Sequence, residues 1–429
     1  MSALTPSQRP EREAIYRRNA VWFLADNVLI NIGTGIAGAS TVVPDLVRHL
    51  TSSEVLIGLA GNLWMVGHTL PQLLVAPWVA RARRKKGWFV GPNAVARLLM
   101  LLFAVLLWRA DPALPERMLV AYFACYGLAA LCGGVLGVAW ADLAGNSLDN
   151  RWRARVLGVT AGITGAAMLG LTPLIGLALA RGGFPRNYAL VFGAAGVLSA
   201  LSVPPLALVH ELPPATAAAE APEAAPAGLS LGRLWAQARA DGPLRAFILL
   251  RVLMSLFMMA GPFYVGYATG PLRLDSAVAV PTLLAMQTAG SIVGALGYTW
   301  LGARSNLLAL RLSMVGAMLL PAGALAAGRL GPWPLYLGFA VAGLASSSMM
   351  SGYLNWIVGY APADRRSGYV ALSNTVAGAM TLLAPLLAGT LVARLGYAPL
   401  FAVALTMAGA ALWVATRALH ERAAVAEAA

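Results

Sequence analysis

The stretch RARVLGVTAGITGAAMLGLTPLIGLALARGGF, residues 153–184, decides the fold, because it is a long apolar run that occurs twice. Its second copy is RSGYVALSNTVAGAMTLLAPLLAGTLVARLGY, residues 366–397, in which Pro385 aligns with Pro173. Both copies end in Ala-Arg, a glycine and an aromatic residue. An apolar run of about 18 residues or more can cross a bilayer as a helix. The pair therefore predicts two similar halves built from membrane-spanning helices.

Runs of this kind fill the chain. The sequence predicts twelve spans, at 19–44, 54–80, 88–108, 118–143, 156–180, 188–209, 244–269, 278–302, 307–327, 334–360, 369–393 and 399–417. Helices are expected because an open strand leaves its backbone polar groups unsatisfied in lipid. Only 11% of the residues are charged, against about 25% in soluble domains, so a soluble fold is excluded.

The positive charges alternate between the two sides of the predicted membrane. Of 31 lysines and arginines, 21 belong to one side, 8 belong to the other, and Arg97 and Arg251 lie deep within spans. Cytoplasmic loops carry the excess of Lys and Arg. We therefore expect both termini in the cytoplasm and the protein in the plasma membrane, the inner membrane of a bacterium. The net charge of +14 is explained by topology, and nucleic-acid binding is not expected.

A polar segment divides the spans six and six. HELPPATAAAEAPEAAPAG, which begins at His210, is typical of a linker, and a short helix at the cytoplasmic interface is expected after it. The predicted organisation is a cytoplasmic tail (1–18), a six-helix bundle (19–209), this linker (210–243), a second six-helix bundle (244–417) and a cytoplasmic C-terminal tail (418–429).

This plan and the basic loop ARARRKKGWF, residues 80–89, resemble the major facilitator superfamily over essentially the whole chain. The loop departs from the superfamily's pattern, since Ala76 and Ala80 stand near where glycine and aspartate are usual. The resemblance implies an all-α membrane protein of two pseudo-symmetric six-helix bundles, and a monomer. It also implies secondary-active transport by alternating access, with the first, fourth, seventh and tenth helices lining a cavity between the bundles.

The fifth span carries GAAMLGLTPLIGL, residues 165–177, which resembles in degraded form the Gly/Pro motif of the superfamily's drug/proton antiporters. The resemblance favours proton-coupled export of a small amphipathic or drug-like molecule. Ordinary glycine-mediated helix packing is the other reading. Proton- or sodium-linked uptake of a nutrient or lipid, and a non-transporting assembly factor or receptor of the same shape, remain alternatives.

Known catalytic and metal-binding motifs are missing from the sequence. There is no phosphate-binding loop and no H-E-x-x-H motif, and the four histidines are scattered at His49, His68, His210 and His420. We expect no enzyme activity, no cofactor and no metal site. An ion gradient, of protons or of sodium, is the expected energy source.

Asp26 is the sharpest functional candidate. A carboxylate about two turns into a membrane span is costly and marks a functional site by default. It could carry the coupling proton, form a static salt bridge with Arg97 or Arg251, or contact a cationic substrate. The sequence leaves these three readings open.

A polar stripe runs along the first span. Asn27, Asn31 and Thr34, followed by Gly38 and Thr41, fall on one face of a continuous helix. Such a stripe would line a water-filled cavity or hydrogen-bond to a neighbouring helix.

The resemblance adds candidates on three other helices. The predicted cavity residues are Tyr122, Tyr126 and Trp140 in the fourth span, Arg251, Ser255, Met258 and Tyr264 in the seventh, and Ser348, Asn355 and Trp356 in the tenth. Core packing is the alternative for each aromatic residue. Pro262 is expected to kink the seventh span.

Charged residues at the cytoplasmic ends form a predicted gate. Its members are Arg83, Arg84, Lys85, Asp142, Arg151, Arg153, Asp364 and Arg365. Plain topology-setting charge is the alternative reading.

Overall fold

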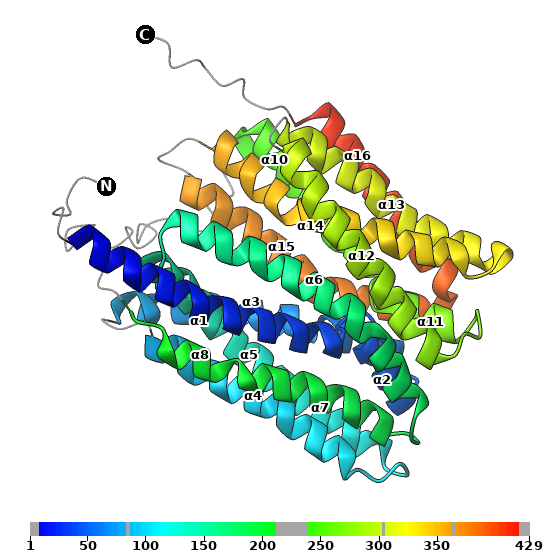
Figure 1. The fold of residues 1–429 in the computed structure, drawn as a ribbon. Coiled ribbons are helices and arrows are strands. Elements are labelled where there is room, and N and C mark those ends of the chain that lie inside the picture. Colours follow the sequence, from blue (N-terminus) through cyan, green and yellow to red (C-terminus); the bar gives the residue numbers. More distant parts are fainter. Residues whose placement is uncertain (1–7, 83–85, 212–238, 303–304, 362–365, 420–429) are drawn as a thin grey trace. The chain divides into compact units, whose positions relative to one another are not determined.

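The computed structural model describes residues 8–82, 86–211, 239–302, 305–361 and 366–419. Within these ranges the regular structure is helical, and no strand occurs (Figure 1). Ten segments of the described chain are long and apolar enough to cross a membrane. Each of the twelve predicted spans coincides with a helix or a pair of helices. The chain is an integral membrane protein, and the predicted fold class is confirmed.

The chain divides into two compact units. Unit 1 contains residues 1–51 and 63–221, and unit 2 contains residues 52–62 and 222–429. The helices of unit 1 are α1 (Gln8–Ala37), α2 (Val42–Leu50), most of α3 (Glu54–Arg81), α4 (Lys86–Trp108), α5 (Pro115–Ser147), α6 (Asn150–Ala180), α7 (Arg186–Leu201) and α8 (Val203–Leu208).

Unit 2 holds the remaining helices and the first residues of α3. Its helices are α10 (Gly242–Met258), α11 (Phe263–Thr269), α12 (Ser276–Gly302), α13 (Asn306–Leu330), α14 (Trp333–Tyr360), α15 (Arg366–Leu395) and α16 (Tyr397–Arg417). The two copies of the sequence repeat form α6 and α15, and each carries its aligned proline inside the helix.

Lipid acts as the solvent of these helices, as α4 illustrates. Its buried face holds Asn93 and Arg97, and its exposed face holds Leu98 and Leu102. A soluble protein would place its apolar residues inside and its charges outside. Here large aliphatic side chains also cover the outer face, where acyl chains can solvate them, and the polar side chains Asn93 and Arg97 face the interior of unit 1.

Three predicted spans are interrupted. The first ends at Ala37, because Gly38 has a φ of +51°, and a separate helix, α2, follows. The sixth breaks at Ser202, before Pro204 and Pro205. The seventh breaks between Met259 and Pro262, so the predicted kink is confirmed.

The ends of the predicted domains are described only in part. α1 already begins at Gln8, so residues 8–18 of the predicted tail are helical. Residues 212–238 of the predicted linker and its interfacial helix, and residues 420–429 of the C-terminal tail, lie outside the described ranges. The stated domain boundaries stay predictions.

Candidate functional site

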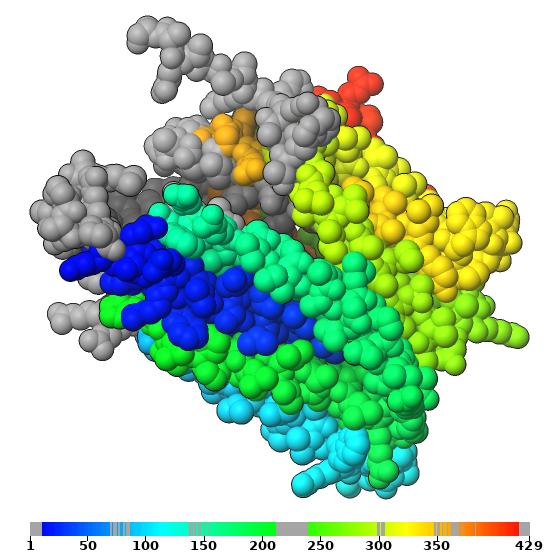
Figure 2. Space-filling model, viewed as in Figure 1, coloured from blue at the N-terminus to red at the C-terminus, as the bar shows by residue number. Residues whose placement is uncertain are grey.

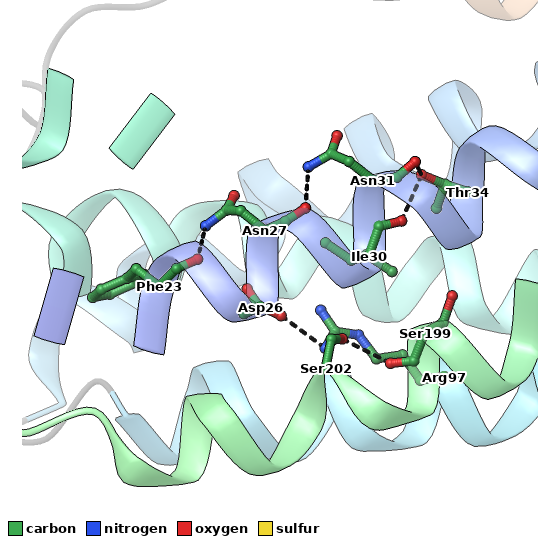
Figure 3. Close-up of polar contacts among 9 residues, drawn as sticks. All are labelled: Phe23, Asp26, Asn27, Ile30, Asn31, Thr34, Arg97, Ser199 and Ser202. Carbon is green, nitrogen blue, oxygen red and sulfur yellow. Dashed lines mark hydrogen bonds and ion pairs between the residues drawn. The ribbon is translucent and has the colours of Figure 1, made fainter. Parts of the chain in front are cut away.

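α1 supplies the first residues of the candidate site. It packs against α6 and α7, and α1 and α6 form neighbouring bands on the visible face of unit 1 (Figure 2). The approach to α7 is close, since a Cβ atom at Gly33 would lie 2.8 Å from the Ala195 carbonyl oxygen. Asp26 projects from one side of α1 and Asn27 and Asn31 from the other (Figure 3).

Asp26 and Arg97 form a buried ion pair. Arg97 Nη1 lies 2.9 Å from Asp26 Oδ1, and both side chains are 4% exposed. Arg97 also donates a hydrogen bond to Ser202 Oγ, which donates to the Ser199 carbonyl oxygen at 2.7 Å (Figure 3). The break between α7 and α8 thus places a hydroxyl beside the pair. Either charge alone would be expensive to bury, so each makes the other tolerable.

The ion pair borders a cavity of about 360 Å³ inside unit 1. Its walls come from α1, α3, α4 and α5, and the lining residues are Asp26, Asn27, Ile30, Trp64, His68, Phe89, Asn93, Ala96, Arg97, Met100, Gly133, Leu136 and Trp140. An apolar and aromatic wall with a few polar groups is the usual make-up of a small-molecule site. The size also falls in the usual range, which begins at about 300 Å³.

Two glycines of α5 allow α3 to bring its aromatic groups to this cavity. A Cβ atom at Gly134 would lie 2.6 Å from the His68 carbonyl oxygen, and one at Gly133 would lie 3.2 Å from the Trp64 ring. Trp64 and His68 stack on one another, with centroids 6.4 Å apart and planes 16° from parallel. The stacked pair forms one wall of the cavity.

The polar stripe of α1 is shorter than the sequence predicts. Because the helix ends at Ala37, Gly38 and Thr41 do not continue it. The side chains of Asn27, Asn31 and Thr34 donate to carbonyl oxygens one turn back in α1, at 2.7, 2.6 and 2.8 Å (Figure 3). Of the three, Asn27 lines the cavity. These hydrogen bonds stay within the helix and do not join it to a neighbour.

Not every predicted aromatic residue reaches the cavity. Trp140 lines it, whereas Tyr122 and Tyr126 do not. Both tyrosines are buried and pack edge-on against Phe103, at centroid distances of 5.5 and 5.4 Å. In unit 2, Tyr264 is likewise buried, in a stack with Phe401. Core packing, the alternative reading, describes these three positions.

The other candidates of unit 2 are dispersed. Trp356 is buried in a stack with Phe247, whereas Asn355 and Met258 are exposed. Ser255 Oγ donates to the Arg251 carbonyl oxygen at 3.0 Å. The side chain of Ser348 is outside the described part of the chain.

Most residues of the predicted gate cannot be placed in the structure. Arg83, Arg84, Lys85, Asp364 and Arg365 fall outside the described ranges, as does the side chain of Asp142. Arg151 is exposed in the first turn of α6. Arg153 Nη2 donates to the Leu148 carbonyl oxygen at 3.5 Å. The gate stays a prediction.

Several cavity residues, among them Trp64, Phe89 and Asn93, were not expected from the sequence, whereas Arg97 was expected as a partner of Asp26. Trp64 and His68 are four residues apart on α3, and Phe89, Asn93 and Arg97 are spaced by four on α4. Such spacing places each set on one helix face. Asn93 is an amide one turn before Arg97 within a predicted span, and this pair was the sequence signal that could have identified this face of α4 as part of the site.

Comparison with known proteins supports the fold. No family model and no curated protein matches the sequence. Among solved structures, the nucleoside transporter NupG is 16% identical with a TM-score of 0.66, covering 93% of this chain and 97% of that one. An auto-inhibited POT family peptide transporter is 15% identical with a TM-score of 0.67, covering 94% and 98%. A D-xylose-proton symporter is 13% identical with a TM-score of 0.64, covering 94% and 98%.

At these identities the likeness concerns the fold. The neighbours span nearly the full length of this chain and are transporters by name. The fold that the resemblance to the major facilitator superfamily implied is confirmed.

Proposed function

We propose that this protein is a secondary-active transporter that works by alternating access and exports a small amphipathic molecule. The cavity of unit 1 carries the proposal, because it joins an aromatic wall to a buried ion pair inside a membrane-embedded bundle. A purely structural ion pair needs no adjacent void of small-molecule size. The fold shared with nucleoside, peptide and xylose transporters supports transport, and not catalysis, as the class.

Asp26 is the proposed coupling residue. A proton on its carboxylate removes the charge that compensates Arg97, and a buried arginine without a counter-ion is unfavourable. Proton binding would therefore favour a conformation in which Arg97 finds another partner, which is how a bound ion shifts a conformational equilibrium. Sodium at the same carboxylate is the alternative, and separately imposed proton and sodium gradients distinguish the two ions.

The orientation in the membrane follows from the loops. With 21 basic residues on one side and 8 on the other, we place both termini in the cytoplasm and the protein, as a monomer, in the inner membrane of a bacterium. Export then corresponds to movement away from the side that carries the termini. Everted membrane vesicles test the direction.

Trp64 and Trp78 provide a matched test of the cavity, because both belong to α3 but only Trp64 lines it, while Trp78 is 61% exposed. Compounds that raise the melting temperature in detergent would be selected from a small-molecule library and assayed for flux in proteoliposomes. Trp64→Ala should reduce binding and flux by about tenfold or more, as expected for a lost aromatic contact. Trp78→Ala should change neither.

Two results would remove the proposal. One is that no compound which stabilises the wild-type protein is carried across the liposome membrane. The other is that Trp64→Ala and Trp78→Ala have equal effects on both binding and flux.

A further inference from the structure

Arg251 is a second intramembrane arginine, and its guanidinium lies far from the ends of the helices around it. It lies nine residues into α10, or roughly 13 Å along the helix. Its Cζ is 4.9 Å from the centroid of the Tyr353 ring, and its Nη2 is 3.5 Å from Asn374 Oδ1. Tyr353 is seven residues from the end of α14 and Asn374 is eight from the start of α15. These contacts hold the charge roughly 10 Å or more from the helix ends, so the side chain does not extend along the helices to their ends.

The charge of Arg251 has no carboxylate to compensate it within the six predicted spans from residue 244 to residue 417. Between residues 244 and 417 the only acidic residues are Asp275 and Asp364, and both belong to loops between predicted spans. Its two side-chain contacts in the described part of the chain, a ring face and an amide oxygen, are neutral. An uncompensated cation in a membrane span is a functional site by default.

Arg311 shows what a structural arginine looks like in the same unit. It lies five residues into α13 and donates two hydrogen bonds to the Ala415 carbonyl oxygen, at 2.9 and 3.1 Å, and one to that of Leu419, at 3.1 Å. These carbonyls lie at the C-terminal end of α16, where the helix dipole favours a positive charge. Arg251 has no comparable set of acceptors among the described residues.

We infer that Arg251 binds an anionic group, a carboxylate or a phosphate, of the transported molecule, whose class is therefore a soluble organic anion. The inference rests on the proposed transport function and deepens it. A guanidinium has five N–H donors in a planar fork that matches both groups, and one of them is engaged by Asn374. Tyr353 supports the cation through its ring face, which leaves the remaining donors for an incoming anion.

The test measures binding, so it does not depend on flux. A panel of aryl and alkyl carboxylates and phosphate monoesters, each paired with its neutral amide or alcohol, would be titrated in neutral detergent while the melting temperature is followed. At least one anion should bind wild-type protein more tightly than its neutral counterpart. Arg251→Gln should weaken the binding of that anion by about 10- to 100-fold, the range expected for the loss of a charge-assisted hydrogen bond. Arg245→Gln, which removes an exposed charge from the same helix, should not.

Asn374→Asp gives a second test that keeps Arg251 in place. The new carboxylate would stand where the amide now lies, 3.5 Å from the guanidinium, and would act as a built-in anion. The variant should fold, should melt at a higher temperature than wild type without ligand, and should lose the preference for anions over their neutral counterparts. This result holds even if Arg251→Gln does not fold.

The inference is overturned if no anion in the panel binds more tightly than its neutral counterpart in a way that requires Arg251. It is equally overturned if Asn374→Asp keeps the wild-type preference for anions. It is also overturned if no soluble anion depends on Arg251, but the wild-type protein melts at a higher temperature in phosphatidylglycerol nanodiscs than in phosphatidylcholine nanodiscs and Arg251→Gln does not. The site would then hold a lipid headgroup. Flux of neutral compounds that require Trp64 would leave the transport proposal standing in each case.

Discussion

Arg97 and Arg251 are chemically identical and both lie within membrane spans, yet their surroundings are opposite. In unit 1, Arg97 is 4% exposed and pairs with Asp26 at 2.9 Å. In unit 2, Arg251 is half-buried and contacts a tyrosine ring and an amide oxygen. The first charge is compensated by the protein itself, and the second contacts only neutral groups among the described residues.

The difference assigns separate tasks to the two arginines. A compensated pair can respond to a proton, because protonation changes its net charge from zero to one. An uncompensated cation can respond to an anion, because binding changes its net charge from one to zero. Coupling in unit 1 and recognition of cargo charge in unit 2 would then follow from which arginine has a carboxylate neighbour.

The largest expected effect is on the compensated pair. Asp26→Asn leaves Arg97 buried without a counter-ion and should lower the free energy of unfolding by about 3–5 kcal/mol. The double variant Asp26→Asn/Arg97→Gln should recover most of that loss, since no unpaired charge remains. Thermal unfolding in detergent measures both. A double variant as unstable as the single one would show that the two side chains are not energetically coupled.

An intermediate effect is expected at Arg311, the arginine held by carbonyl oxygens. Arg311→Gln removes charge-assisted hydrogen bonds to Ala415 and Leu419, so the free energy of unfolding should fall by about 1.5–3 kcal/mol. Binding of anions should be unchanged. The comparison would need revision if this variant, and not Arg251→Gln, abolished the anion preference.

The smallest effect on stability is expected at Arg251. Arg251→Gln removes one cation–π contact and one long hydrogen bond, so the free energy of unfolding should change by less than about 1 kcal/mol in the absence of ligand. The same melting curves that detect Asp26→Asn measure this. A loss as large as that of Asp26→Asn would mean that Arg251 is a structural residue, and the contrast between the two arginines would disappear.

Much of the fold could be predicted from sequence because lipid imposes simple requirements. Apolar length located the spans, and the aligned Pro173 and Pro385 marked the repeat that forms α6 and α15. Pro262 marked a real break. Gly38 was read as part of a continuous helix, because a glycine in an apolar run gives no sign that its backbone turns to positive φ.

The candidate site was harder to predict than the fold. Asp26 stood out by its charge, but the choice between Arg97 and Arg251 as its partner depends on which helices pack together. The same limit applies to the aromatic residues. Tyr122 and Trp140 share one helix, yet one is buried against Phe103 and the other lines the cavity. Trp64 and Asn93 belong to helices that packing, and not composition, brings to the cavity.

The most direct test of the account is gradient-driven transport by the charge-neutral double variant Asp26→Asn/Arg97→Gln. Proteoliposomes would be loaded with a compound that binds wild-type protein, and its accumulation under an imposed pH gradient would be compared with exchange at equal pH on both sides. The account predicts that exchange persists while the gradient no longer drives accumulation. Accumulation at the wild-type level would contradict it, because the coupling proton could not then reside on Asp26.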